Sequence, residues 1–356
     1  MVSTVRMGGS RESFAFIVHP LEAKRDVARR YPLLAQVLPP ALIRAGARVW
    51  PSLVLSRITG MRSAETGKGI EGWLLACPLT ARQMLKLPPQ VVYDKVVRAG
   101  RLGQKQGARI LGLGAFTSVV GDGGVTVAQR LNMPVTTGNS LTVAMAVGAL
   151  EDAARKRDLV LETATAAVVG ASGSIGLACG EMLARLVESL ILVGRQEIHV
   201  SQARAQVEAA GTADVRVSTR LDDIREADLV LSATSAVEPI IEPRHLKEGA
   251  IVCDVARPPD VSPAVRRARK DVSIINGGIV DVPGHVDFGF DFGLPAGQVF
   301  ACMAEVMVLA LEGRYESFSL GQRVEREKVL GIARLARKHG FELSADSSGH
   351  GELAAD

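Results

Sequence analysis

The sequence is poor in aromatic residues and cysteine, and it contains no long apolar run. Only 4% of its 356 residues are Phe, Trp or Tyr, so Ala, Val, Leu and Gly must fill most of the core. Cys77, Cys179, Cys253 and Cys302 form no CxxC pair and no zinc-type spacing, which indicates reduced thiols in a cytoplasmic protein. No secretory signal and no stretch of about 18 uninterrupted apolar residues is visible, so we expect no membrane span.

The excess of one sign of charge over the other is also small. The net charge is +4 and the isoelectric point is about 9.0, and the basic residues are dispersed rather than gathered into a stripe. This distribution argues against a nucleic-acid partner and would favour an acidic protein or a phosphate-bearing ligand. The six histidines show no ligand spacing, so we expect no metal site. Asp287 and Asp291 could pair on one side of a loop.

The pattern of residues 1–150 predicts an α/β domain, which would hold the substrate. Alternating apolar runs give the elements, with strands at 14–20, at 69–79 and within 109–124, and helices at 81–107 and after the polar turn 137–140. Residues 39–60 mix basic and apolar side chains, which is typical of core-facing helices with solvated arginines. The same mixture would also suit a peripheral contact with a membrane or a lipid-carrying partner. Ser140 could cap the helix after the turn.

From Thr163 onward, apolar strands and helices alternate strictly. The expected strands are 165–170, 189–195, 214–219, 227–235, 250–257 and 272–278. Strands separated by helical crossovers predict a parallel sheet wound on both faces. The fold class is therefore α/β, with a Rossmann-type doubly wound parallel sheet that is preceded by an α/β substrate domain and followed by C-terminal helices.

The last part of the chain predicts two helices. Residues after Gly278 should be loop-like to Pro295, and helices should run from about 296 to 311 and from about 323 to 339. The predicted divisions are a substrate- or acyl-binding domain (1–150), a nucleotide-binding domain (151–282), a C-terminal helical segment (283–345) and a disordered polar tail (346–356).

The turn GASGSIG, residues 170–176, follows an apolar strand and opens a helix, which is the context that a dinucleotide site requires. Gly170 permits the sharp turn, Gly173 lets the backbone approach a pyrophosphate, and Gly176 lets the helix pack on its strand. The helix N-terminus then attracts the phosphate charge. The predicted cofactor contacts in this turn are Gly170, Ser172, Gly173, Ser174, Ile175 and Gly176.

The second strand of this domain ends at Arg195, where an NAD site usually carries an acidic residue. An arginine there suits the 2′-phosphate of NADP, so the sequence favours NADPH; a plain exposed loop arginine is the alternative. The ends of later strands should also lie over the cofactor. They supply Ala233, Thr234, Ala256 and Gly277.

Cys302 is the candidate nucleophile. It lies in the Ala-rich stretch 293–319, just after the nucleotide domain. A cysteine on an apolar helix is more often inert core. If the helix begins near 296, the thiol also lies too deep for the helix dipole to lower its pKa much.

Six stretches of the sequence resemble the cyanobacterial-type long-chain acyl-(acyl-carrier-protein) reductases. They keep their order over nearly the whole chain, and the FAC helix and the TTGN turn are the more specific matches. The stretches are FTSVV (116–120), TTGNSLT (136–142), VVGASGSIG (168–176), NGGIV (276–280), FACMAEVMVLALEG (300–313) and KHGF (338–341).

This resemblance implies NADPH-dependent reduction of a fatty acyl thioester to an aldehyde, with Cys302 taking the acyl group first. The substrate would be an acyl carrier protein conjugate or acyl-CoA, and a downstream enzyme would consume the aldehyde. Thr117, Ser118 and Asn139 are candidate donors to the developing oxyanion, and turn capping is their alternative role. His285 is the candidate proton acceptor or positive charge for the thiol.

Two other functions stay open. Residues 280–299 and the pair Ser140-Leu141 depart from the family pattern, which leaves the carrier and the chain length open. A shikimate- or amino-acid-dehydrogenase-like enzyme would need a Lys-Asp pair, and Lys86 or Lys95 would supply its lysine. A nucleotide-binding protein without turnover would bind NADPH and show no thiol reactivity.

Overall fold

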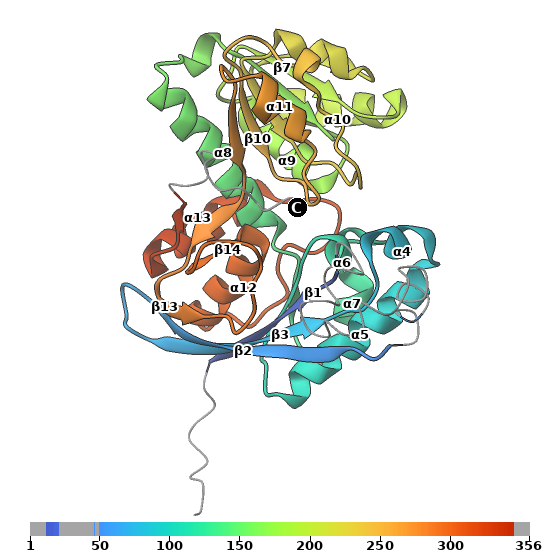
Figure 1. Cartoon of the computed structure of the whole chain (residues 1–356), viewed down its shortest axis with the longest axis vertical. Coiled ribbons are helices and arrows are strands. Elements are labelled where there is room, and N and C mark those ends of the chain that lie inside the picture. Colours follow the sequence, from blue (N-terminus) through green and yellow to red (C-terminus); the bar gives the residue numbers. More distant parts are fainter. Residues whose placement is uncertain (1–11, 21–45, 47–49, 345–356) are drawn as a thin grey trace, which may run out of the picture.

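The computed structural model describes residues 12–20, 46 and 50–344. The chain forms two lobes, each built on a six-stranded sheet (Figure 1). The predicted polar tail and most of the basic-apolar segment before residue 50 lie outside the described residues. Within the described part, none of the helices combines the length and apolar character needed to cross a membrane.

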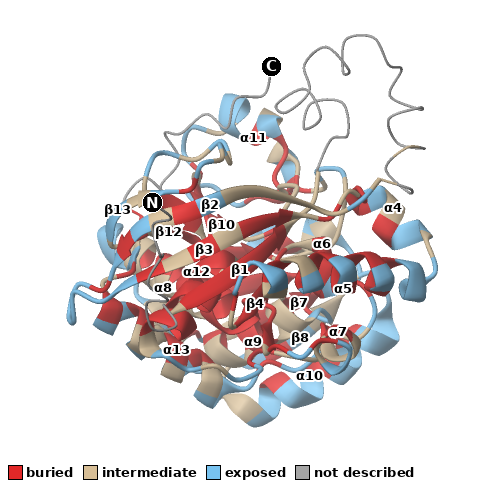
Figure 2. Cartoon of the chain, turned by 90° about the horizontal axis from the view of Figure 1, so that it is seen from below, coloured by how far each residue is buried: buried red, intermediate tan, exposed pale blue. Residues whose placement is uncertain are grey.

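The first lobe contains a mixed sheet in the order β13-β2-β3-β1-β4-β5. Its strands are β1 (Ser13–Val18), β2 (Leu53–Arg62), β3 (Gly69–Ala76), β4 (Leu111–Leu113), β5 (Val135–Thr136) and β13 (Gly284–Asp287). The central strand β1 is buried along most of its length (Figure 2). Because side chains alternate along a strand, Phe14 and Phe16 enter one apolar cluster while Ala15 and Ile17 enter another.

Helices cover both faces of this sheet. The helix α5 (Pro89–Lys105) packs Val92 and Val96 into the cluster of Ala15 and Ile17. The helix α12 (Ala301–Glu312) lies on the other face and packs Val306 into the cluster of Phe14. The shorter helices on this lobe are α4 (Ala81–Lys86), α6 (Phe116–Val119) and α7 (Val125–Gln129). A helix from the end of the chain therefore completes the core of the first lobe.

Two predictions for this lobe are wrong. Residues 53–60, expected to be helical, belong to the long strand β2, in which Ile58 faces the core while Arg57 faces solvent. The expected loop after Gly278 contains β12 (Ile279–Asp281) and β13. β13 pairs antiparallel with β2, and β12 pairs with β14 (Gln298–Phe300) and β15 (Glu342–Leu343). Strands of three or four residues are too short to give a readable apolar alternation.

The second lobe confirms the doubly wound fold. Its sheet has the order β11-β10-β9-β6-β7-β8, with every neighbouring pair parallel, which is the order of a Rossmann domain. The strands are β6 (Thr165–Val169), β7 (Ser189–Val193), β8 (Asp214–Ser218), β9 (Leu229–Ser232), β10 (Ile251–Asp254) and β11 (Ser273–Asn276). The helices are α8 (Asn139–Lys156), α9 (Ser174–Leu183), α10 (Glu197–Ala210) and α11 (Pro263–Ala268).

Each face of this sheet has its own apolar cluster. Val168, Leu192 and Leu231 pack with Val143 and Leu150 of α8 on one face. On the opposite face the strand residues pack with Ile224 and Val265, among others. The helix α8 leads from the first lobe into the second. The exact domain boundaries near residues 150 and 282 stay predictions.

The helix that carries Cys302 begins later than expected, at Ala301 rather than near residue 296. Gly297 is left-handed (φ +82°), and residues 298–300 are extended in β14, so the chain cannot turn helical earlier. Cys302 is thus the second residue of α12 instead of lying two turns inside it. The final helix, α13 (Arg326–His339), matches its prediction closely.

Candidate active site

The start of α12 lies where the two lobes meet. The amide of Ala301 donates to the carbonyl of Gly278, just beyond β11, at 2.7 Å. Gly138, in the TTGN turn before α8, packs directly on the cysteine: a Cβ at Gly138 would lie 2.2 Å from the Cα of Cys302. Its φ of +78° also favours glycine. Cys302 is half-buried and packs on the TTGN turn, while the preceding residue, Ala301, is bonded just beyond the end of β11.

The TTGN turn also reaches the glycine loop. The side-chain amide of Asn139 donates to the hydroxyl of Ser174 at 3.3 Å. Ser174 is the first residue of α9, in the predicted cofactor turn. One short turn therefore connects the candidate nucleophile to the candidate phosphate site.

Several groups act on the thiol of Cys302. Burial, and to a smaller extent the nearby carboxyl of Glu305, raise its pKa to about 11. Hydrogen bonds from the amides of Met303 and Ala115, and the positive charge of Arg257, lower the pKa but do not offset burial. The first turn of a helix adds about 0.3–1 kcal/mol in favour of a thiolate. The resting group at neutral pH is the thiol.

The FTSVV segment forms the wall beside the sulfur. Ala115, just before α6, has φ +46°, which is a strained conformation for a residue with a Cβ. The next amide, of Phe116, donates to Nε2 of His19 at 3.2 Å. Burial lowers the pKa of His19 to about 4, so the ring is neutral and can accept this bond. His19, which sequence reasoning did not single out, thus holds the segment in place.

Glu305 joins the cysteine helix to the TTGN turn, and its role was also missed. It is fully buried one helical turn after Cys302. Its carboxyl accepts the amides of Gly138 (3.1 Å) and Leu141 (2.8 Å) and the hydroxyl of Thr136. These amides are at the uncapped N-terminus of α8, so a carboxyl from another helix performs the capping. In the sequence, Glu305 was part of the FAC motif, but nothing there indicated its role.

The capping role expected for Ser140 is wrong. Because Gly138 is the N-cap of α8, Ser140 already lies inside the helix. Its hydroxyl accepts a hydrogen bond from Ser319 at 2.6 Å. The left-handed glycine starts the helix earlier than the sequence pattern indicated.

The three candidate oxyanion donors differ in what they contact. Thr117 donates its hydroxyl to the carbonyl of Gly114 at 2.7 Å, and Ser118 donates to that of Ala115 at 2.7 Å. Both hydroxyls therefore bond within the α6 turn in this structure. Asn139 faces Ser174 instead. A role for any of the three in oxyanion binding stays a prediction.

The residues of the glycine loop fit a dinucleotide. Gly170 is left-handed (φ +86°), and a Cβ at Gly176 would lie 2.2 Å from the carbonyl oxygen of Gly170. Around Gly173 the nearest atom to a Cβ would be 3.4 Å away, and both Ser172 and Gly173 are exposed. No side chain caps α9, so the first amides, including those of Ser174, Ile175 and Gly176, are free for phosphate oxygens.

Two buried aspartates hold the neighbouring loops. Asp260 accepts the hydroxyl of Ser232 (2.6 Å) and both the amide (3.0 Å) and hydroxyl (2.5 Å) of Thr234. Asp254 accepts the amides of Ala256 (3.0 Å) and Val261 (2.9 Å), and burial raises its pKa to about 6. Sequence reasoning named Thr234 and Ala256 but neither aspartate.

The strand ends gather at one edge of the sheet, as expected. A Cβ at Gly170 would lie 2.7 Å from the carbonyl oxygen of Ala233, which joins the glycine loop to the end of β9. A Cβ at Gly277 would lie 2.4 Å from the sulfur of Cys253 in β10. The predicted cofactor residues on these strands are therefore neighbours in space.

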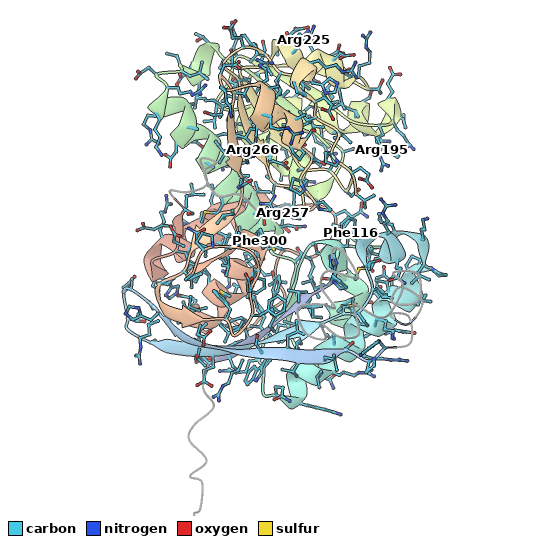
Figure 3. All side chains as sticks on the ribbon, viewed as in Figure 1. Phe116, Arg195, Arg225, Arg257, Arg266 and Phe300 are labelled. Carbon is cyan, nitrogen blue, oxygen red and sulfur yellow. The ribbon has the colours of Figure 1, made fainter. Side chains whose placement is uncertain are left out.

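Arg195 is exposed after β7 (Figure 3). Next to its loop is a hollow lined by Glu197, Val200, Val217, Ser218, Thr219 and Arg220. Arg220 was not singled out from the sequence, yet it follows β8 as Arg195 follows β7.

Arg257 was also missed. It follows β10 and, with Phe300, lies where the lobes meet (Figure 3). The guanidinium stands 5.1 Å from the centroid of the Phe300 ring, and Nη1 donates to the carbonyl of Ala256 at 2.6 Å. Its charge acts on the thiol of Cys302. The only signal in the sequence was a basic residue at the carboxyl end of a Rossmann strand.

The remaining candidates lie elsewhere. His285 is exposed on β13, where its carbonyl faces Gly60 of β2, and it is not among the charges that act on Cys302. Asp287 and Asp291 each accept the amide of the glycine two residues on. In the described part of the chain, no three His, Cys, Asp or Glu residues cluster in a way that could hold a metal ion.

The lysines considered for a Lys-Asp pair of a dehydrogenase, Lys86 and Lys95, show no carboxylate partner among the contacts of the described residues. Lys95 is buried and donates to the carbonyl of Trp50 at 2.8 Å; no carboxylate is among the groups that shift its pKa. Lys86 is exposed in the last turn of α4.

Comparison with known proteins agrees with this geometry. A family model described as Shikimate / quinate 5-dehydrogenase matches residues 151–276, the nucleotide-binding part. The chain is 28% identical to the long-chain acyl-[acyl-carrier-protein] reductase of Synechococcus elongatus, over 92% of its own length and 98% of that protein. It is 33% identical over 82% of its length to the aminotransferase PigE of Serratia sp., but it spans only about a third (34%) of that relative.

Among solved structures, glutamyl-tRNA reductase from Methanopyrus kandleri is 18% identical and aligns with a TM-score of 0.32 over 70% of this chain and 53% of its own. The family match over residues 151–276 and the strand order of the second lobe show that the chain has an NAD(P)-binding fold of the oxidoreductase type.

Proposed function

We propose that this chain reduces a fatty acyl thioester to an aldehyde, using NADPH and a Cys302-bound acyl group. The observation that carries the proposal is the position of Cys302 at the first turn of α12, in contact with Gly138 and beside the end of β11. The similarity over 92% of the chain to an acyl-[acyl-carrier-protein] reductase supports the choice of substrate class.

The first half-reaction is a thiol exchange. The sulfur of Cys302 attacks the thioester carbonyl carbon, a C–S bond to Cys302 forms, and the C–S bond to the carrier breaks. The carrier thiolate leaves and takes up the proton that Cys302 loses. The two thioesters have similar energy, so the step needs little driving force. The amide of Ala115, already bonded to the sulfur, would stabilise the thiolate during attack.

The second half-reaction reduces the acyl group. A bound reduced nicotinamide supplies a hydride to the acyl carbon. The hemithioacetal anion on Cys302 then collapses: the carbon–sulfur bond breaks, the aldehyde leaves and the Cys302 thiolate regains a proton. The fixed contact between Gly138 and Cys302, and the bond from Asn139 to Ser174, would keep the sulfur aligned with the cofactor loop.

The cofactor is NADPH in this proposal. Arg195 and Arg220 lie on the loops after adjacent strands and are both exposed, which would suit the 2′-phosphate. The residues expected to hold the remainder of the dinucleotide are those of the glycine loop, with Ala233, Thr234, Ala256 and Gly277 at the sheet edge.

Partners follow from the substrate. We propose an acyl carrier protein or coenzyme A as the carrier and an enzyme that consumes the aldehyde as the next step. A cytoplasmic location and a peripheral membrane contact stay predictions. Of the basic-apolar segment that suggested the contact, residues 53–60 belong to β2, and most of the part before residue 50 lies outside the described residues.

Replacing the sulfur tests the proposal. Cys302→Ala should abolish aldehyde formation from acyl-CoA, and Cys302→Ser should reduce it by several orders of magnitude, because the hydroxyl is a far weaker nucleophile. Cys77→Ser is the control, since Cys77 is a buried core residue with a pKa raised to about 11 and no place in the mechanism. Full activity of Cys302→Ala would refute the covalent route.

A second function is favoured by one finding. The match of residues 151–276 to the shikimate / quinate dehydrogenase family would suit hydride transfer to a small polar substrate. That enzyme would keep its activity in Cys302→Ala. Aldehyde assays and a panel of polar hydroxy and amino acids, run on the same variant, separate the two functions.

A further inference from the structure

Arg257 has two buried donors that the protein does not use. Its Nη1 donates to the carbonyl oxygens of Ala256 (2.6 Å) and Asp254 (3.4 Å). Its Nε and Nη2 are enclosed and have no hydrogen-bond partner within the described residues. The ring of Phe300, two residues before Cys302, lies 5.1 Å from the guanidinium.

An enclosed guanidinium with unpaired donors is costly. The group keeps its charge at all physiological pH values, and each N–H that is buried without an acceptor destabilises the folded state. Native proteins pair nearly all such groups, so an exception calls for an absent partner. The two carboxylates that interact electrostatically with Arg257 already accept other donors: Asp254 accepts two backbone amides, and Asp260 accepts from Ser232 and Thr234.

The position of Arg257 indicates what the partner is. The guanidinium interacts electrostatically with Asp254 and Asp260 and with the sulfurs of Cys253 and Cys302, so it lies within electrostatic reach of the candidate nucleophile. The hydroxyls of Thr117 and Ser118 already bond within their own turn. The glycine loop, which suits a pyrophosphate, is built on β6 and α9 rather than on the loop of Arg257.

We propose that Arg257 binds the carbonyl oxygen of the acyl group on Cys302, donating from Nε and Nη2. This inference rests on the proposed function. When the sulfur attacks, the carbonyl electron pair moves onto this oxygen, and Arg257 stabilises the anion until the carrier thiolate leaves. The same pair moves again when a reduced nicotinamide dinucleotide delivers hydride, and it returns when the carbon–sulfur bond breaks.

Single-turnover kinetics of Arg257→Gln and Arg257→Lys test this role. Acylation of Cys302 by acyl-CoA and aldehyde release should each slow about 10²–10³-fold in Arg257→Gln, as for loss of an oxyanion donor. Arg257→Lys should fall between this variant and wild type. Arg225→Gln is the matched control, because Arg225 also donates to a backbone carbonyl, of Arg244, but lies at the far end of the second lobe (Figure 3).

Two measurements separate the possible failures. If wild type forms no acyl-Cys302, the proposed function is wrong. If wild type acylates and both Arg257 variants match its rates, or only their NADPH affinity falls, the role of Arg257 alone is overturned. Should the variants not fold, infrared difference spectra of wild type with a ¹³C-labelled acyl carbonyl decide: a band below that of a free thioester supports the bond, and an unshifted band contradicts it.

Discussion

At the scale of single residues, the account depends on how tightly Cys302 is fixed. Its residue type and its resemblance to the FAC motif were readable from the sequence, and so were the glycines of the cofactor loop. Arg257, Glu305 and His19 were not, because their roles arise from contacts between segments far apart in the chain. No local sequence pattern identifies an arginine whose charge acts on a cysteine of the other lobe.

Gly138→Ala should be far more harmful than an alanine at another left-handed glycine. The new Cβ would lie 2.2 Å from the Cα of Cys302, besides the strain of φ +78°. Gly107→Ala is the control, since Gly107 has φ +91° with nothing within 4 Å. The control should cost about 1–2 kcal/mol of stability in urea unfolding. Gly138→Ala should cost more and abolish activity; equal losses would contradict the contact.

Alkylation of Cys302 should depend on pH in an unusual way. Its raised pKa of about 11 means that the thiolate is minor at neutral pH and grows about tenfold per pH unit. The iodoacetamide rate at Cys302, followed by peptide mass spectrometry, should therefore still be rising at pH 10. A plateau near pH 8.5, the value of an ordinary thiol, would show that burial does not control this group.

At the scale of elements, regular apolar strands were predictable and short polar ones were not. Five of the six strands from β6 to β11 are mainly apolar runs and β8 alternates apolar and polar residues, so the sequence indicated all six. β13 has mostly exposed residues, and its pairing with β2 depends on a chain reversal that no local pattern reveals. The start of α12 was misplaced because neither the left-handed Gly297 nor the three-residue strand β14 was readable from the sequence. The relation of Cys302 to the helix dipole was therefore misjudged as well.

Glu305 should be essential for joining α12 to α8. Glu305→Ala would leave the amides of Gly138 and Leu141 and the hydroxyl of Thr136 buried without an acceptor. We expect a loss of about 3–5 kcal/mol in the free energy of unfolding. Glu325→Ala, which removes an exposed pair with Lys328, should cost under about 0.5 kcal/mol. Similar losses for both variants in urea titrations would contradict the role of Glu305 in joining α12 to α8.

At the scale of the whole molecule, the two lobes contribute different parts of the candidate site. The second lobe has the strand order and glycine loop of a dinucleotide-binding domain. The first lobe takes α12 into its core, so the cysteine is carried by one lobe and faces the strand ends of the other. The doubly wound topology could be predicted from local sequence patterns. The return of the C-terminal helix α12 to the first sheet could not, because it depends on contacts between distant segments.

Cofactor choice belongs to this scale, because it depends on two loops of the second lobe. Arg195→Glu combined with Arg220→Ala should weaken NADPH binding by at least about tenfold and leave NADH binding little changed. Fluorescence titration with each nucleotide measures both affinities. A parallel loss for both nucleotides, or no loss for NADPH, would contradict recognition of the 2′-phosphate by these arginines.

The central claim is that Cys302 carries the acyl group to the cofactor. Rapid-quench intact-mass analysis tests it directly: the protein is mixed with a long-chain acyl-CoA, and NADPH is added afterwards. We predict one added acyl mass, mapped to the peptide that contains Cys302, which disappears as aldehyde is released. Aldehyde formed without any acylated protein, or an adduct on another residue, would contradict the account.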